Sequence, residues 1–499
     1  MKTDLIYFEE TELEFTDGQR AAHPADGLSV FGPYASEGMN KLKQLNYAVI
    51  GTTMGVKLFG DFALAMKHPL YCPAGKKELL WPHFPGMEEA FHVLWDGQPG
   101  AAEMIQERVL LDAAADNDPH KRVYGVVELY LEAMRKALKR DQTFQCFVCV
   151  VPEMVWMNCR ITKKYVKDGQ GKRISSGEVN LRKGGQSNMF EEYPTDQYNF
   201  SLDFRRQLKA RAMELRVPVQ IMRDTTLRLS DENRFGARGL TPMADRAWNL
   251  GTAMYYKGVG KPWKLAGARK GVCYIGIAFK NETPGGRNAC CAAQMFLSSG
   301  DGMVFLGDFG PWYSPVSKQY YLPKEKASAL LKQVLASYDP VDAGPLTEIF
   351  LHCRAKINEE AYEGYKEACP PGVKLVVIRV APEVGGIRMY RKGTRPVVRG
   401  TFWPVNEHRG FLWASGFAPR TATYAGSDLP VPLRLQVQYG ETDIVQVARD
   451  IFDLSKLNYN ACKLGEDQPV TVKFSNAVGE ILIANRNLPV RLPNFKYYI

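Results

Sequence analysis

The sequence lacks any hydrophobic run long enough to cross a bilayer, and its first ten residues contain no apolar signal core. The most apolar runs, such as residues 147–156, are far too short for a membrane span. We therefore expect a cytoplasmic protein with no membrane partner. Internal repeats, low-complexity tracts and coiled-coil heptads are also missing, which argues against solenoid and fibrous folds. The 499 residues, 45% of them hydrophobic, are enough for several globular cores.

Motifs for metal and nucleotide chemistry are scarce as well. The seven histidines form no HxxxH or HxH pair, and Cys146 and Cys149 have no second pair at zinc spacing, so we interpret these thiols as core residues in a reducing compartment. Gly258-Val-Gly-Lys261 lacks the glycine spacing of an ATP-binding loop, and Pro262 stands where a Ser or Thr is needed. A small-molecule Rossmann enzyme remains an alternative, although no Gly-x-Gly-x-x-Gly or Ser/His/Asp pattern supports it.

The charge balance is modestly basic, with a net charge of +10 and a pI of about 8.9. This excess favours an acidic partner such as nucleic acid, but many ordinary enzymes share it. Residues 160–200 form a polar, glycine-rich stretch with many cations. This stretch is either a solvated loop or a contact for a phosphate backbone. Its basic residues are Lys163, Lys164, Lys167, Lys172, Arg173, Arg182 and Lys183.

Alternating strand and helix patterns predict an α/β fold. Residues 46–52 read as a strand followed by a helix to about residue 67, residues 123–140 as an amphipathic helix, and residues 144–156 as a β-rich run. These elements indicate a Rossmann-like layer from about residue 35 to 260. By contrast, the Pro- and Gly-rich residues 68–100 predict irregular surface.

The second half predicts a different α/β outline. Residues 272–279, 288–297 and 303–305 read as a three-strand meander. Helical and strand patterns then alternate over residues 324–338, 348–353, 359–369 and 374–380, and residues 444–453 and 475–484 are helical. A meander followed by alternating β and α elements is the outline of a ribonuclease H-like domain.

A basic helix gives the first candidate site. Phe204, Leu208, Ala212 and Leu215 recur at helical spacing, with Ser201 or Asp203 as the cap. The cations Arg205, Lys209 and Arg216 fall on a neighbouring face, and Gln220 lies on the short strand predicted after Pro218. Cations on adjacent turns followed by an amide suit a phosphate. The alternative is a solvated basic face.

Several segments, in this order and spacing, resemble prokaryotic Argonautes of the short class that has only MID and PIWI domains. They are residues 23–33, residues 205–209 with 217–220, residues 249–263, residues 458–460 with 469–471, and residues 495–499. The resemblance implies a Rossmann-like MID domain with its lead-in segment over residues 1–266. It also implies a ribonuclease H-like PIWI domain over residues 267–499.

The family resemblance implies a pocket for the 5′-phosphate of a guide strand. Its residues would be Arg205, Lys209, Gln220 and Lys257. In many relatives the C-terminal carboxylate, here that of Ile499, shares a divalent cation with this phosphate. We therefore expect Mg²⁺ near Gln220 and Ile499.

The sequence departs from the family at the positions that hold catalytic metal ions. Ala278, Arg354 and Asn476 stand where carboxylates or histidine are expected, so we expect no cleavage. The glutamate finger has no clear counterpart, although Asp301 and Asp308 lie nearby. Arg354 either neutralises a duplex backbone or merely fills the space of a lost site. An active endonuclease that uses other acids is the alternative.

The resemblance also implies partners. A guide RNA would pair with single-stranded target DNA, and target binding would activate a separate APAZ-containing effector chain, in a heterodimer that forms higher oligomers. Residues 288–297 and 307–312 are most similar to members associated with a TIR domain, in which NAD⁺ loss kills or arrests the invaded cell. A sirtuin-like or nuclease effector is the alternative.

Overall fold

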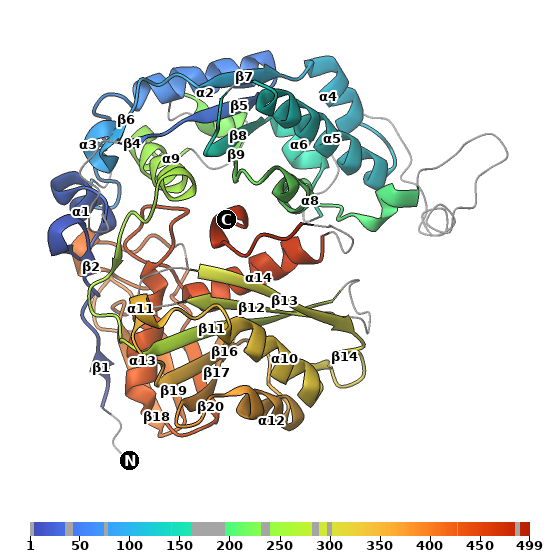
Figure 1. Cartoon of the computed structure of the whole chain (residues 1–499). Coiled ribbons are helices and arrows are strands. Elements are labelled where there is room, and N and C mark those ends of the chain that lie inside the picture. The colour runs from blue at the N-terminus through green and yellow to red at the C-terminus, as the bar shows by residue number, and fades with distance from the viewer. Residues whose placement is uncertain are drawn as a thin grey trace.

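The computed structural model describes residues 4–34, 43–73, 78–140, 142–161, 195–230, 240–281, 289–296, 302–384, 386–426, 428–484 and 490–499. They form two lobes, with the C-terminal segment lying between them (Figure 1). None of the helices in these ranges is long and apolar enough to span a membrane.

A parallel four-stranded sheet forms the centre of the first lobe. Alternate residues of its strands face two separate cores: Tyr47 and Val49 pack with the helix α2, whereas Ala48 and Ile50 pack with α5. Burial on both faces explains the unbroken apolar runs in these strands. The predicted Rossmann-like layer is confirmed. The sheet order is β7 (Ala101–Met104), β5 (Tyr47–Gly51), β8 (Cys146–Val151) and β9 (Val219–Arg223), and the helices that concern the site are α2 (Thr53–Ala65), α5 (Pro119–Leu138), α8 (Phe204–Ala212) and α9 (Met243–Gly258).

A nine-stranded mixed sheet forms the second lobe. The antiparallel meander β11–β12–β13 is present as predicted, and β16 and β17 continue the sheet in parallel with β11. The ribonuclease H-like outline is thus confirmed. The strands, in sheet order, are β1 (Ile6–Tyr7), β18 (Thr401–Asn406), β19 (Arg409–Trp413), β20 (Leu433–Tyr439), β17 (Lys374–Pro382), β16 (Glu348–Cys353), β11 (Val272–Asn281), β12 (Ala289–Phe296) and β13 (Gly302–Gly310). The helices are α10 (Lys324–Leu335), α12 (Glu359–Ala368), α13 (Ile444–Asp453) and α14 (Val470–Leu482).

Two local predictions are wrong. The β-rich run predicted over residues 144–156 ends at Val151, because Pro152 cannot donate to the sheet and α6 (Glu153–Asn158) begins directly after it. Residues 68–100 are not only surface. Phe84 and Phe91 are fully buried and pack edge-on against Trp248, at ring-centroid distances of 5.0 and 6.1 Å. These aromatic residues are too sparse along the sequence to give the periodic hydrophobic pattern of a buried helix or strand.

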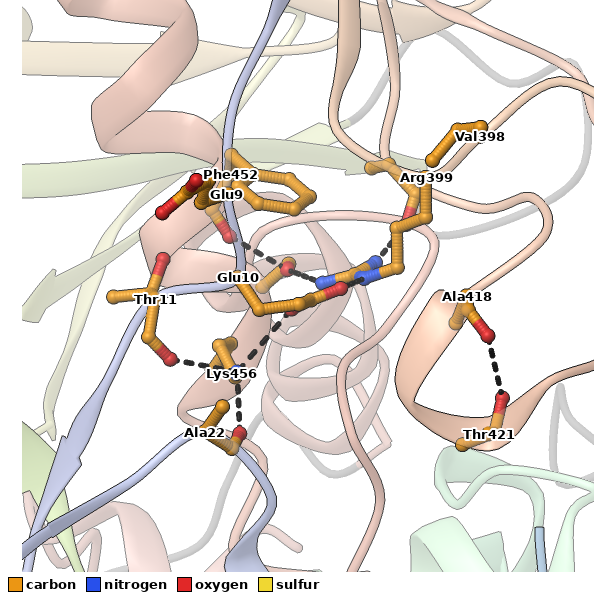
Figure 2. Close-up of polar contacts among 12 residues, drawn as sticks. Glu9, Glu10, Thr11, Ala22, Val398, Arg399, Ala418, Thr421, Phe452 and Lys456 are labelled. Carbon is orange, nitrogen blue, oxygen red and sulfur yellow. Dashed lines mark hydrogen bonds and ion pairs between the residues drawn. The ribbon is translucent and has the colours of Figure 1, made fainter. Parts of the chain in front are cut away.

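Buried ion pairs attach the N-terminal segment to the second lobe, where β1 pairs with β18. The Glu10 carboxylate accepts hydrogen bonds from Arg399 (2.8 Å) and Lys456 (3.2 Å), as Figure 2 shows. Lys456 also donates to the carbonyls of Thr11 (2.7 Å) and Ala22 (2.6 Å). These contacts therefore bind the lead-in segment of the first half to the second lobe.

Candidate functional site

Helix α8 presents the basic side chains predicted from the sequence. Asp203 caps it by accepting a hydrogen bond from the Arg206 backbone N–H (3.2 Å). Phe204, Leu208 and Ala212 are buried against the core that includes α5, which confirms the apolar face. The helix is shorter than predicted. It ends at Ala212 and passes through a tight 3₁₀ turn, Met213–Leu215.

Arg216 does not share the environment of the other predicted cations. It has a left-handed backbone (φ 54°), and its side chain is exposed. Its carbonyl accepts a hydrogen bond from the Tyr497 hydroxyl (3.0 Å), which ties the turn after α8 to the C-terminal segment. The turn at Arg216 breaks the helical spacing that would have placed it over Lys209.

Lys209 and Lys257 are both buried, and the charge of Lys257 acts on Lys209. Lys209 on α8 is 4% exposed and donates hydrogen bonds to a terminal oxygen of Ile499 and, at 3.4 Å, to the Val219 carbonyl. Lys257 on α9 is 0% exposed, and its ammonium makes no hydrogen bond with any residue that the structure describes. An ammonium buried without a partner is costly, which makes this point a candidate for an anion.

The electrostatics of the cluster support that interpretation. Burial, then the nearby charges of Lys257 and Arg205, hold the pKa of Lys209 well below its ordinary value. Burial also lowers the pKa of Lys257 to about 8, with Arg205 adding to the effect and the nearby Cys146 opposing it. Arg205 itself has a lowered pKa, chiefly because of burial. The charges of Lys209, Lys257 and Arg205 thus repel one another, and a bound anion would relieve this repulsion.

Gln220 lies beside this cluster, but its side chain follows its own strand. The amide nitrogen donates to the Ile221 carbonyl (3.4 Å) and lies 3.6 Å from the Met222 sulfur. The Gln220 amide must therefore rotate to reach a ligand near Lys209.

The structure adds Cys146 to the site, at the start of β8. The thiol is fully buried beside the Gln220 backbone, and burial raises its pKa to about 11 even though Lys257, Lys209 and Lys496 favour the thiolate. The sequence showed Cys146 only as a small apolar residue in a strand. Nothing in its spacing pointed to three lysines.

The oxygen atoms at this site are of the kind that Mg²⁺ prefers, namely the Gln220 amide and the Ile499 carboxylate. Within the described residues, however, no three His, Cys, Asp or Glu side chains gather around a possible metal position. Lys209 already donates to Ile499, and two further cations lie near. A divalent cation fits these residues only together with a bound anion that offsets the three positive charges.

A second candidate site lies in the other lobe, beside β11 and the end of β16. Ala278, Arg354 and Asn476 come together there and line one cavity of about 580 Å³. Four further cations share this lining: Lys280, Lys318, Lys356 and Arg379. Among the described residues that line the cavity there is no aspartate or glutamate.

The remaining sequence predictions lie outside the described residues. They concern Asp301, the side chain of Asp308, and the basic residues within 162–194.

Comparisons with known proteins give the fold. No protein-family model and no curated protein matches this chain. Among solved structures, the chain is similar to an Argonaute of Clostridium butyricum bound to a guide DNA and a 19-mer target DNA, with a TM-score of 0.60, 14% identity and 97% of this chain covered. It is also similar to Aa-Ago with externally bound siRNA (TM-score 0.56, 13% identity, 100% covered) and to A. aeolicus Argonaute (TM-score 0.55, 12% identity, 99% covered).

These similarities extend over both lobes, so the chain has an Argonaute-like fold of the MID–PIWI type. The chain spans only about half of each solved protein, namely 53%, 56% and 54% of their lengths.

Proposed function

We propose that this chain, with its Argonaute-like fold, is a guide-loaded recognition subunit that binds nucleic acid and does not cut it. One observation carries the proposal: Lys209 and Lys257 are buried together with the terminal carboxyl of Ile499, and the Lys257 ammonium has no hydrogen-bond partner among the described residues. A phosphate supplies two negative charges and several acceptors. The 5′-phosphate of a guide RNA is the ligand that we assign to this pocket.

Arg205 and Gln220 would complete the phosphate pocket. Arg205 adds a guanidinium charge that stays fixed over the physiological pH range, and Gln220 can donate through its amide after rotating away from Ile221. In this proposal, the Gln220 amide oxygen and the Ile499 carboxylate would help to hold Mg²⁺ beside the bound phosphate. The metal ion would neutralise charge and position the guide.

The second cavity supports the proposed absence of cleavage. Cutting a phosphodiester with two metal ions needs several carboxylates, whereas Ala278, Arg354 and Asn476 offer none. Among the described lining residues, the charges are positive and repel divalent cations. An active endonuclease is therefore disfavoured, and we assign NAD⁺ hydrolysis to a partner chain only.

Target sequence would be read by base pairing with the guide, while the protein contacts the backbone. We propose single-stranded DNA as the target and an APAZ-containing chain with a TIR NADase domain as the partner. Target binding would activate this partner in defence against plasmids or phage. The choice of guide, target and effector rests on family resemblance, and a sirtuin-like or nuclease effector is the alternative.

A binding experiment tests the proposal directly. Labelled RNA and DNA guides, each with a 5′-phosphate or a 5′-hydroxyl, are titrated against the protein in Mg²⁺ and in EDTA. We expect 5′-phosphorylated RNA to bind tightest and EDTA to weaken that binding only. A complementary target incubated with Mg²⁺ or Mn²⁺ should remain intact. Equal affinity for phosphate and hydroxyl ends would contradict the pocket, and cut product would contradict the absence of cleavage.

A further inference from the structure

The cavity lined by Lys280, Lys318, Arg354, Lys356 and Arg379 is strongly cationic. We call it the cationic cavity. Within the described part of the chain, three of its cations, namely Lys318, Arg354 and Lys356, form no ion pair with a carboxylate. All three are exposed at the mouth of the cavity. Their charge is therefore available to a ligand.

The two other cations are more firmly placed. Lys280 on β11 pairs with Glu480 of α14 (3.2 Å), and both side chains are about three-quarters buried. Arg379 on β17 donates a hydrogen bond from Nε to the Arg354 carbonyl (3.1 Å), which orders the backbone after β16. Burial and the nearby Arg434 lower the pKa of Arg379. The cations come from separate elements, so the fold itself gathers them.

Neutral polar groups complete the lining. Ser317 and Lys318 lie between β14 (Tyr313–Ser314) and β15 (Gln319–Tyr320), Gln319 begins β15, and Asn476 lies on α14. The Asn476 amide nitrogen donates to the Val472 carbonyl (3.0 Å). Hydroxyl and amide groups among lysines and arginines are typical of protein contacts with phosphate oxygens.

A structural link connects this cavity with the first pocket. Glu480 accepts contacts from Lys280 of the cavity (3.2 Å) and from Arg206 of α8 (2.8 Å). Helix α14 packs on both β11 and α8, between the two lobes (Figure 1). Helix α14 therefore connects two sites: the pocket beside α8, where we propose that the 5′ end of a guide binds, and the cationic cavity.

We propose that the cationic cavity is a metal-independent binding site for a backbone phosphodiester of the guide–target duplex. This inference rests on the proposed function and deepens it. Fixed lysine and arginine charges neutralise the phosphate there, and neither Ala278 nor Asn476 in the lining carries a carboxylate that would repel it. The ligand chemistry is that of a phosphate group, which a free polyphosphate also offers.

The test uses the full chain loaded with a 5′-phosphorylated guide. The double variant Arg354→Glu/Lys356→Glu is compared with Lys332→Glu/Lys366→Glu, which reverses two exposed lysines on α10 and α12 and changes the net charge equally. Target affinity is measured by fluorescence anisotropy at several salt concentrations, with and without EDTA. We expect the cavity variant to bind the target roughly 10-fold or more weakly than the wild type. The slope of log affinity against log salt concentration should become shallower by about 2. The control should show neither change.

Three further results distinguish the possible failures. Guide loading should be unchanged in the cavity variant, and Arg354→Lys/Lys356→Arg should restore target binding. Equal target affinity in the cavity variant and the control, with loading intact, would overturn the cavity proposal and leave the proposed function standing. If the wild-type chain loads no guide, both proposals fall. Tight binding of inorganic tripolyphosphate to the unloaded chain, lost in the cavity variant alone, would assign the cavity to free polyphosphate and overturn the backbone assignment.

Discussion

Lys209 and Ile499 are joined by a hydrogen bond from the lysine ammonium to a terminal oxygen of the last residue, across 290 positions of the chain. The charges of Lys257 and Arg205 lie near Lys209 and repel its ammonium. A single oxygen of Ile499 offsets only part of this charge. The pocket therefore retains a positive excess that an incoming phosphate can neutralise.

Reversing the two lysine charges tests this pocket. We expect Lys209→Glu/Lys257→Glu to weaken binding of a 5′-phosphorylated guide by roughly 100-fold or more, because two charge-assisted contacts become repulsive. Binding of a 5′-hydroxyl guide should change much less. Parallel titrations of both guides measure the difference.

Lys332→Glu is a suitable control for that experiment, since Lys332 is exposed on α10 and far from α8 in the sequence. Circular dichroism should show that the double variant is folded. If both guides lose affinity equally, the phosphate is bound elsewhere.

A neutral substitution separates stability from binding. Lys257→Met removes a buried ammonium while keeping a side chain of similar length. The pKa of Lys257 falls from 10.5 to about 8 on folding, which corresponds to a cost on the order of 3 kcal/mol that is fully present at pH 7. We expect the unliganded variant to melt at a higher temperature than the wild type.

The same variant should lose the thermal stabilisation that a 5′-phosphorylated guide gives the wild type. Lys332→Met, at an exposed position, should leave both melting temperatures unchanged. A lower melting temperature for unliganded Lys257→Met would show that the ammonium has a partner that stabilises it.

Guide affinity should also depend on pH. Lys257 loses its proton in the free protein as pH rises through about 8, and a bound phosphate raises its pKa. The phosphate, with a second pKa of about 6, stays dianionic over this range. Affinity for 5′-phosphorylated guides should thus be highest below pH 8 and fall above it.

Lys257→Arg gives the diagnostic comparison, because a guanidinium stays protonated throughout this range. Its affinity should fall less steeply between pH 7.5 and 9.5, as measured by anisotropy. A profile identical to that of the wild type would rule out Lys257 as the titrating group.

The fold could be predicted from the sequence where local patterns are strong. Strands β5, β8, β11 and β16 are apolar runs buried on both faces, and the helices between them carry clear periods. Phe84 and Phe91 were missed because isolated aromatic residues pack through tertiary contacts with Trp248, which leave no periodic signal.

The candidate site was predictable only in part, for the same reason. Arg205 and Lys209 lie one turn apart on a helix, which the local sequence shows. Their proximity to Lys257 and Cys146 depends on how α9 and β8 pack, and composition says nothing about it. Arg216 shows the opposite error. Its spacing from Lys209 predicted a shared helical face, but its left-handed backbone ends that helical spacing.

Glu10 of the N-terminal segment pairs with two buried cations of the second lobe. Burial alone would raise the pKa of Glu10, but Arg399 and Lys456 hold it below its ordinary value. Glu10→Gln would leave both buried cations without a carboxylate. Breaking a buried ion pair typically costs about 3–5 kcal/mol, so we expect a large loss of stability in urea unfolding.

Glu9→Gln is the matched control, because the adjacent Glu9 is exposed. The pH dependence of the free energy of unfolding provides a second measurement. A carboxylate with a lowered folded pKa stabilises the protein above its unfolded pKa, near 4.5, and loses that contribution as pH falls through the folded value. Glu10→Gln should therefore flatten acid destabilisation below about pH 4.5, whereas Glu9→Gln should not. If both variants unfold like the wild type, the ion pairs of Glu10 do not hold the segment in place.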